Sequence, residues 1–321
     1  MAAASRTTST ARNRPPALAV FGEFFFDLVF YHLPATPRLG EEVKTDSFFE
    51  APGGGLATTA LAARKLGTAT AILTRVGEDA LSRPAWQGLA RQGLDTSACE
   101  VRRGASTALT ACITWDHDRM MVTHDAINRD LEELLTRPKV LARLRQAKHV
   151  HIACPPRSAR LWQPLLRDLR ERGITLSADT GWNPDLKPTR LRSILRHCHF
   201  LFPNDREALA LTGASTVEKA LHDLERWADY PVIKMGAEGS LMAAGGETLH
   251  VPALEVPFVD ATGAGDAFDG GFLHAWLRRS SWRDCLRAGN ICGGMAVTAP
   301  GGSAGLPTRS QFNQLLKTKL R

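Results

Sequence analysis

Short apolar runs alternate with amphipathic stretches through the middle of the chain, and this alternation limits the folds that the chain can adopt. The apolar runs that predict strands are residues 149–154, 175–178, 199–202 and 232–234. Helical periodicity fills intervals between them, at residues 160–172 and 207–211. Strands that alternate with helices are typical of a parallel sheet covered on both faces. We therefore expect an α/β fold whose ligands bind at the carboxyl ends of the strands.

A glycine-rich turn with the sequence VDATGAGDAF, at residues 259–268, precedes a helical pattern near the C-terminus. Gly263 and Gly265 allow a tight turn whose N–H groups point at one spot, where a helix dipole also favours an anion. Asp266 lies at this turn and has two interpretations. It is a general base that takes a proton from a hydroxyl attacking a phosphate, or it is a helix N-cap. Capping accounts for the aspartate but not for the glycines.

The segment Asp260-Ala-Thr-Gly-Ala-Gly-Asp-Ala-Phe resembles the C-terminal signature of the ribokinase-like (PfkB) family of sugar and nucleoside kinases. Further matches occur in the expected order from Leu18 onward. The resemblance implies a central, mainly parallel sheet flanked by helices, with a small β-sheet lid over the sugar. It also implies an enzyme that transfers the γ-phosphate of ATP to a primary hydroxyl of a carbohydrate. The alternatives are a nucleoside kinase of the same family and a non-catalytic member that binds a sugar or a nucleotide.

The resemblance also assigns roles around the glycine-rich turn. Asp266 is the implied general base, and the other catalytic positions of the turn are Gly263, Ala264 and Gly265. Backbone carbonyls near this turn and in the loop at residues 298–305 hold a monovalent cation in such kinases, and a ring of carbonyl oxygens suits K⁺. The positions implied for this cation are Asp260, Thr262, Ala296, Ala299 and Gly301.

Asp27 lies within an apolar run at residues 17–30 that predicts a buried strand. A charge in such a run needs a partner or a function, and the alternative is a strand-end or turn carboxylate. By resemblance, Asp27 binds sugar hydroxyls. The opening Phe-Gly-Glu-x-x-x-Asp, at residues 21–27, is similar to that of fructokinases.

Gly53 and Gly54 precede a helical pattern at residues 56–66 and suggest a backbone close to a ligand. A dinucleotide-binding fingerprint would need glycine where this chain has Thr58, so we reject it. The stretch resembles the N-terminal signature of the PfkB family, in which the glycine pair touches the sugar. The family usually has Asn at the position of Thr58, and Phe25 and Cys154 stand where ribokinases have polar sugar contacts. We therefore expect ribose to be a poor acceptor, while Phe25 could stack on the base of a nucleoside.

Asn204 and Glu207 come directly after a predicted strand. An acid at a helix start is often a capping-box member or a dipole partner. The alternative is a Mg²⁺ site, because Mg²⁺ keeps several waters and needs few protein oxygens beside phosphates. The Asn-x-x-Glu spacing matches the magnesium and phosphate motif of the family. Both residues are therefore expected to hold Mg²⁺, largely through water.

The turn at residues 234–239 is the implied ATP site. Gly236 and Gly239 would let the backbone pass close to a nucleotide. Lys234 either contacts phosphate or is a solvated lysine at a strand end. Asn290 corresponds to the family position near the adenine.

Alternating patterns at residues 41–50 and 108–123 predict two hairpins outside the main sheet. By resemblance they belong to the lid, in segments of about 31–50 and 106–124, which in this family often pairs into a homodimer. Residues 17–321 are expected to form one kinase domain after a flexible tail at residues 1–16. A lid is useful because it excludes water that would otherwise take the phosphate.

Composition excludes several other classes of protein. The formal net charge is +7, but Lys and Arg are spread out, so we expect no nucleic-acid partner. No apolar run is long enough to span a membrane. Six cysteines without a CxxC pair predict reduced thiols in a cytoplasmic protein. The pairs His149/His151 and His197/His199 lack a third ligand at useful spacing, which disfavours a zinc site.

Overall fold

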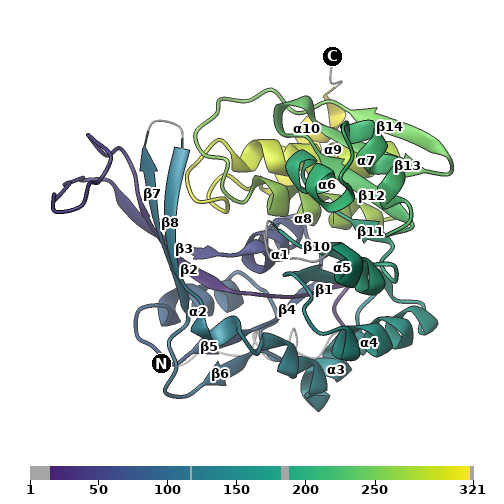
Figure 1. The fold of residues 1–321 in the computed structure, drawn as a ribbon, viewed down its shortest axis with the longest axis horizontal. Helices are drawn as coiled ribbons and strands as arrows, with labels where there is room; N and C mark the ends of the chain where they lie inside the picture. Colours follow the sequence, from purple (N-terminus) through teal and green to yellow (C-terminus); the bar gives the residue numbers. More distant parts are fainter. Residues whose placement is uncertain (1–14, 116–117, 182–187, 319–321) are drawn as a thin grey trace, which may run out of the picture.

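The computed structural model describes residues 15–115, 118–181 and 188–318, and its central feature is a mostly parallel sheet (Figure 1). The strand order is β14-β13-β12-β11-β10-β9-β1-β4, and only the pairs that β13 forms are antiparallel. The prediction of an α/β fold is therefore confirmed. The strands are β1 (Leu18–Gly22), β4 (Thr70–Leu73), β9 (His149–Ala153), β10 (Thr175–Asp179), β11 (Phe200–Leu201), β12 (Tyr230–Lys234), β13 (Ser240–Ala244) and β14 (Glu247–Val251).

Helices cover both faces of this sheet and bury two apolar clusters. Alternate residues of a strand point to opposite faces, so Phe21 of β1 packs in one cluster and Val20 in the other. The cluster of Phe21 includes residues of α3 (Pro138–Arg145), α4 (Ala159–Glu171), α5 (Pro188–Leu195), α6 (Asp205–Thr212) and α7 (Val217–Leu224). The cluster of Val20 includes residues of α1 (Gly55–Lys65), α2 (Arg83–Arg91), α8 (Ala264–Leu277), α9 (Trp282–Ala296) and α10 (Arg309–Lys317).

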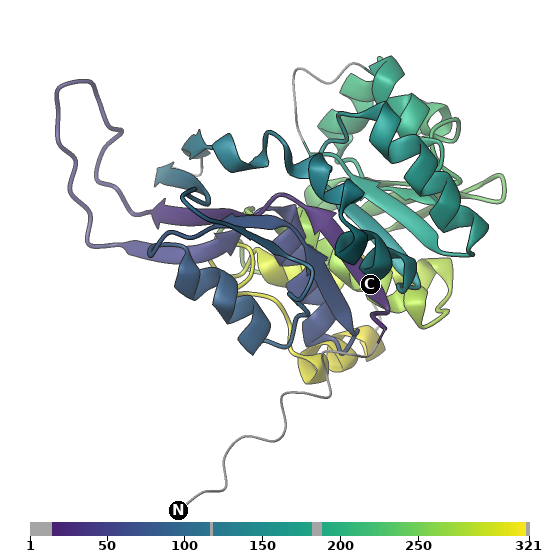
Figure 2. The same cartoon turned by 90° about the horizontal axis from the view of Figure 1, so that it is seen from below.

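A separate four-stranded sheet stands beside the main body and forms the lid (Figures 1 and 2). Its order is β3-β2-β7-β8, with β2 and β7 parallel and the outer pairs antiparallel. The segment between β2 and β3 extends away from the body (Figure 2). The lid strands are β2 (Phe25–Phe30), β3 (Phe48–Gly53), β7 (Ala108–Trp115) and β8 (Asp118–His124).

Two predictions about this region are wrong. Residues 17–30 are not one strand, because the chain leaves the main sheet after Gly22 and enters the lid at Phe25. Residues 41–50 do not form their own hairpin, since β3 pairs with β2 and residues 41–47 contain no strand. An alternating pattern indicates which face is buried but does not name the partner strand. The hairpin predicted at residues 108–123 is confirmed as β7 and β8.

Smaller elements complete the described chain. A two-stranded parallel sheet joins β5 (Arg75–Gly77) to β6 (Glu100–Arg102). Short 3₁₀ helices are η2 (Ala126–Asn128), η3 (Leu131–Thr136) and η4 (Gly236–Glu238). All six cysteines are unbridged. Among the residues that the structure describes, no helix is both long and apolar enough to cross a membrane.

Candidate active site

A cavity of about 1170 Å³ opens at the carboxyl ends of the parallel strands. Ala153 at the end of β9, Asp179 at the end of β10 and Lys234 at the end of β12 line it. The N-terminal residues of α6 and α8 contribute to the wall as well. This is the edge of the sheet at which the sequence predicted ligand binding.

The glycine-rich turn forms the start of α8 and faces this cavity. Gly263 is the N-cap, with a left-handed φ of 70° that favours glycine, and α8 begins at Ala264. Asp266 is the third helical residue, and no side chain caps this helix. The interpretation of Asp266 as an N-cap is therefore wrong. The N–H of Ala264 donates to the Ala261 carbonyl at 3.3 Å, and that of Ala267 donates to the Gly263 carbonyl at 2.9 Å. The N–H groups between them, those of Gly265 and Asp266, precede the first helical hydrogen bond and are available to an anion.

Asp266 lies against Gly55, the first residue of α1. A Cβ atom added to Gly55 would lie 2.7 Å from Oδ1 of Asp266, so the glycine makes room for the carboxylate. Burial, and after it the charge of Asp179, raises the pKa of Asp266 to about 7 against the lowering effect of the Lys234 ammonium. A carboxyl with a pKa near 7 is suited to accept a proton at neutral pH. Gly55 ends the glycine run before the helix, which the sequence predicted to lie close to a ligand.

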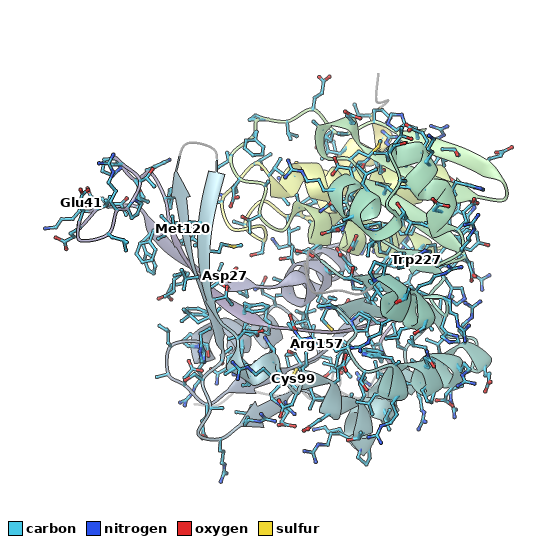
Figure 3. The ribbon with its side chains drawn as sticks, in the orientation of Figure 1. Asp27, Glu41, Cys99, Met120, Arg157 and Trp227 are labelled. Atoms are coloured by element: carbon cyan, nitrogen blue, oxygen red, sulfur yellow. The ribbon has the colours of Figure 1, made fainter. Side chains whose placement is uncertain are left out.

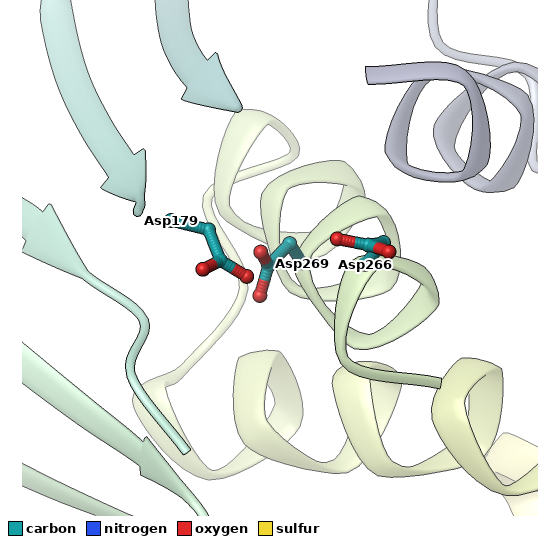
Figure 4. A group of neighbouring side chains, drawn as sticks. All are labelled: Asp179, Asp266 and Asp269. Atoms are coloured by element: carbon teal, nitrogen blue, oxygen red, sulfur yellow. The ribbon is translucent and has the colours of Figure 1, made fainter. Parts of the chain in front are cut away.

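A buried cluster of charges lies behind Asp266 (Figure 4). Nζ of Lys234 lies 2.6 Å from Oδ2 of Asp179 and 3.4 Å from Oδ1 of Asp269. Carboxylate oxygens of Asp179, Asp266 and Asp269 lie within 4.8 Å of one another. Lys234 is only 9% exposed, so its interpretation as a solvated lysine is wrong. Its Nζ would be 3.0 Å from a Cβ on Gly265, which places the ammonium beside the glycine-rich turn.

Sequence reasoning missed Asp179 and Asp269. Asp179 ends β10, and an acid directly after an apolar run at the ligand-binding edge was the available signal. Asp269 is fully buried within the apolar pattern of α8, and its Oδ2 has no hydrogen-bond partner among the described residues. A charged residue on a core face of a helix is the signal that could have found it.

His149 and His151 of β9 contact the side-chain hydroxyls of the neighbouring strand β10. His149 Nδ1 lies 2.7 Å from the Thr175 hydroxyl, and His149 Nε2 lies 2.7 Å from the Ser177 hydroxyl. His151 Nδ1 contacts the same Ser177 hydroxyl at 2.8 Å, and its Nε2 lies 3.8 Å from Asp269 Oδ2. Burial lowers the pKa of both imidazoles, which favours their neutral forms. Each ring is therefore engaged with the hydroxyls of β10.

Asn204 and Glu207 form a capping box at the start of α6 and line the cavity. Asn204 Oδ1 accepts a hydrogen bond from the Glu207 amide, and Glu207 Oε2 accepts one from the Asn204 amide. Burial and the charge of Asp179 raise the pKa of Glu207. The carboxylates of this region outnumber the ammonium of Lys234, and such a donor set fits a divalent cation.

A glycine turn and a group of apolar side chains also line the cavity. Gly236 and Gly239 adopt φ values of 57° and 95°, and both line the cavity. Asn290 lines it too, but its amide nitrogen donates to the carbonyls of Val251 and Pro252, each at 2.9 Å. This amide therefore fixes the start of the loop after β14. The side chains of this apolar wall are Ala237, Ala253, Leu254, Val256 and Phe258.

Asp260 ties the loop after α9 to the glycine-rich turn. Its Oδ1 accepts hydrogen bonds from the amide and hydroxyl of Thr262, and its Oδ2 accepts one from the Gly301 amide at 2.9 Å. The loop thus folds back onto the turn, which the sequence could not establish. Ala296 ends α9, and Ala299 lies between it and Gly301.

The acceptor residues predicted from the sequence lie where lid and body meet. Asp27 of β2 lies against Gly53 of β3, where an added Cβ would be 2.0 Å from the carboxylate (Figure 3). Burial raises the pKa of Asp27 to about 6. Gly54 adopts a φ of 83°, and a Cβ atom added to it would lie 3.0 Å from the Phe25 ring. Phe25 and Cys154 line the cavity.

Thr58 lies apart from the other acceptor positions. It is buried in α1, and its side chain lies beneath Gly263, 3.3 Å from the position of an added Cβ. Its hydroxyl is therefore next to the glycine-rich turn rather than on the wall that Phe25 and Cys154 form. Its predicted role toward the substrate stays a prediction.

Known proteins resemble this chain over nearly its whole length. A model of the pfkB family of carbohydrate kinases matches residues 16–309. A ribokinase of Haemophilus influenzae is 25% identical over 317 residues, which cover 94% of this chain and 98% of that protein. The structure of Arabidopsis thaliana ribokinase complexed with ribose and ATP has a TM-score of 0.82 at 21% identity, covering 95% of this chain and 99% of the other.

A nucleoside kinase shares the fold as well. The structure of Burkholderia thailandensis nucleoside kinase in complex with inosine has a TM-score of 0.77 at 19% identity, covering 94% of this chain and 98% of the other. Both structural likenesses support the ribokinase-like fold of sheet, helices and lid. Because the family model spans most of the sequence, including both glycine-rich segments, the chain belongs to the pfkB family of carbohydrate kinases.

Proposed function

We propose that this protein transfers the γ-phosphate of ATP to a primary hydroxyl of a sugar. The observation that carries the proposal is Asp266, whose pKa is raised to about 7 and which lies at the anion-binding start of α8 inside the cavity. A base and a set of free N–H groups at one point are what an attacking hydroxyl and a developing negative charge require. Membership of the pfkB family supports the same reaction.

Separate residues are proposed for proton transfer, charge stabilisation, acceptor binding and nucleotide binding. Asp266 accepts the proton of the attacking hydroxyl, and the N–H groups of Gly265 and Asp266 stabilise the charge that develops on the phosphate. The N–H of Ala264, which the sequence also predicted for this role, donates to the Ala261 carbonyl. Asp27 and the pair Gly53 and Gly54 orient the acceptor under the lid. The turn of Gly236 and Gly239 and the apolar wall beside Asn290 bind the nucleotide, and Lys234 contributes its positive charge beside the glycine-rich turn.

Two cations belong to this proposal. Asn204 and Glu207 would hold Mg²⁺, mostly through water, and the ion would neutralise charge on the phosphates. Backbone carbonyls near Asp260 and in the loop that its carboxylate fixes, at Ala296, Ala299 and Gly301, would hold K⁺. The hydrogen bonds that the Asp260 carboxylate accepts from both segments support a common site.

The test is ATP turnover with a panel of sugars and nucleosides. Ribose is expected to have a lower kcat/KM than another member of the panel, because Phe25 and Cys154 put an aromatic ring and a thiol on the cavity wall. A nucleoside as the best acceptor would favour the second candidate, a nucleoside kinase in which Phe25 stacks on the base. Ligand binding with no turnover of any acceptor would identify a non-catalytic member and end the kinase proposal.

Glu207→Gln should weaken activity at limiting Mg²⁺ while leaving the fold intact. The amide keeps an oxygen for the capping box but removes the charge that would attract the ion. The measurement is turnover across a magnesium titration together with the melting temperature. Glu218→Gln, in the first turn of α7, is the matched control outside the cavity. An unchanged magnesium dependence would remove the assignment of Asn204 and Glu207.

We also propose that the protein is cytoplasmic and that two copies pair through their lids. Side chains on β3 and β8 support the pairing, because Phe48, Met120, Met121 and Val122 are 47%, 48%, 53% and 66% exposed. β3 and β8 are the two edge strands of the lid sheet, and exposed apolar groups on the edges of a sheet are typical of an interaction surface. A monomer at all concentrations in analytical ultracentrifugation would contradict this pairing.

A further inference from the structure

We call the part of the cavity lining formed by Glu23, Phe25, Asp125, Cys154 and Arg157 the acceptor wall, and it contains two carboxylates and one guanidinium. Glu23, directly after β1, and Asp125, directly before η2, both line this wall. Arg157, in the loop between β9 and α4, places its guanidinium there, 3.2 Å from Glu23 Oε1. Figure 3 shows Arg157 on the body and Asp27 on the lid. None of Glu23, Asp125 and Arg157 has a role in the phosphate transfer described above.

Glu132 fixes the loop that carries Arg157. Its Oε1 accepts hydrogen bonds from the Arg157 amide and from Trp162 Nε1, and its Oε2 accepts one from the Ser158 amide at 2.8 Å. The side chain of Glu132 is thereby fully engaged with the start of α4. The backbone of Arg157 is therefore held in place at this wall, and its guanidinium lies 3.2 Å from Glu23 Oε1.

The surroundings of Glu23 disfavour additional negative charge. Burial raises the pKa of Glu23 to about 7, the charges of Asp125 and Glu132 raise it as well, and Arg157 only partly offsets them. Cys154, on the same wall, is buried with its pKa raised. A ligand group that donates hydrogen bonds or carries positive charge is attracted by these carboxylates, whereas a ligand carboxylate or phosphate is repelled by them.

We propose that Glu23 is a specificity-determining residue that excludes anionic acceptors, so that the acceptor is an uncharged or amino-bearing polyhydroxy compound and not a sugar acid or sugar phosphate. The inference rests on the proposed function, because it concerns the acceptor of the same site. The competing assignment makes Arg157 an anchor for an acceptor carboxylate or phosphate. The two assignments predict opposite effects of the same substitutions.

The experiment compares matched acceptors that differ in charge: fructose with fructose 6-phosphate, and glucitol with gluconate. Dissociation constants come from calorimetry without ATP, and kcat/KM comes from ATP turnover. The wild type should favour the neutral member of each pair. Glu23→Gln should reduce this preference by about tenfold, the scale of one like-charge contact in a partly solvated site. Arg157→Gln should increase it, because the wall then loses its guanidinium.

Glu133→Gln and Arg160→Gln, at exposed positions near the same loop, are the matched controls and should leave the preference unchanged. A wild type that prefers the anionic members, and loses that preference in Arg157→Gln, would overturn the proposal. An unchanged preference in a folded Glu23→Gln protein would do so too. Binding without turnover would refute the kinase function alone, since the dissociation constants still decide the charge selectivity. No binding of any acceptor would overturn both.

Discussion

Asp266→Asn is expected to lower kcat by about 10²–10⁴-fold, the usual contribution of a general base, while ATP still binds. The amide keeps the size of the side chain but cannot accept the proton of the attacking hydroxyl. Stability should change little, because Asp266 makes no capping hydrogen bond and its ionised form is disfavoured by burial. Turnover, nucleotide affinity and melting temperature are measured on the same protein.

Asp284→Asn provides a matched control for this substitution. Asp284 is the third residue of α9, as Asp266 is of α8, but it is exposed, and its carboxylate accepts a hydrogen bond from the Ser281 hydroxyl at the helix cap. The Asp284→Asn variant should keep wild-type turnover.

In the wild type, kcat/KM should rise as the pH passes through about 7, because Asp266 must be ionised to act as a base. Wild-type turnover in a folded Asp266→Asn protein would end the proposed mechanism.

Lys234→Met is expected to lower the free energy of unfolding by about 3–5 kcal/mol, the usual cost of removing one partner of a buried ion pair. The ammonium lies between Asp179 and Asp269, and its loss leaves carboxylates buried without a counter-charge. Turnover per folded molecule should also fall, because the positive charge beside the glycine-rich turn is gone. Urea unfolding at pH 8 measures the first effect, with exposed Lys219→Met as the control.

The destabilisation caused by Lys234→Met should be larger at pH 8 than in acid. Lys234 holds the pKa of Asp179 below its usual value. The stabilisation from this pair is therefore present above the ordinary pKa of an aspartate and is lost as the pH falls through the lowered value. The destabilisation should be smaller in acid, and Asp179→Asn added to Lys234→Met should restore part of the loss. An equal loss at pH 8 and near pH 3 would contradict this account.

Local patterns in the sequence were sufficient to predict much of the fold and the glycine-rich turn at the centre of the site. Apolar runs located β9 to β12, because a fully buried parallel strand is apolar on both faces. The glycines at residues 263 and 265 located the start of α8, since few other residues permit a left-handed turn there. The prediction of Asp266 as a base rested on the same segment and is still to be tested by substitution.

Features that depend on distant partners were not predictable in the same way. Lys234 contacts Asp179 and Asp269 across 55 and 35 residues of sequence, so no local spacing identifies the cluster. The break between β1 and β2 was missed although Gly22 and Glu23 mark it, because three phenylalanines resume the apolar run directly after them. Glu23 lies at this break, and only the structure shows which side chains surround it.

The short connection between β1 and β2 has a thermodynamic consequence for closure of the lid. Only Glu23 and Phe24 separate a strand of the body from a strand of the lid, and Gly54 separates β3 from α1. Any rotation of one sheet against the other must change backbone torsions at these few residues, which adjoin Asp27 and the acceptor wall. An acceptor that contacts both sides therefore binds the closed arrangement more tightly than the open one. By linkage, that difference in affinity is the free energy available to shift the population toward closure.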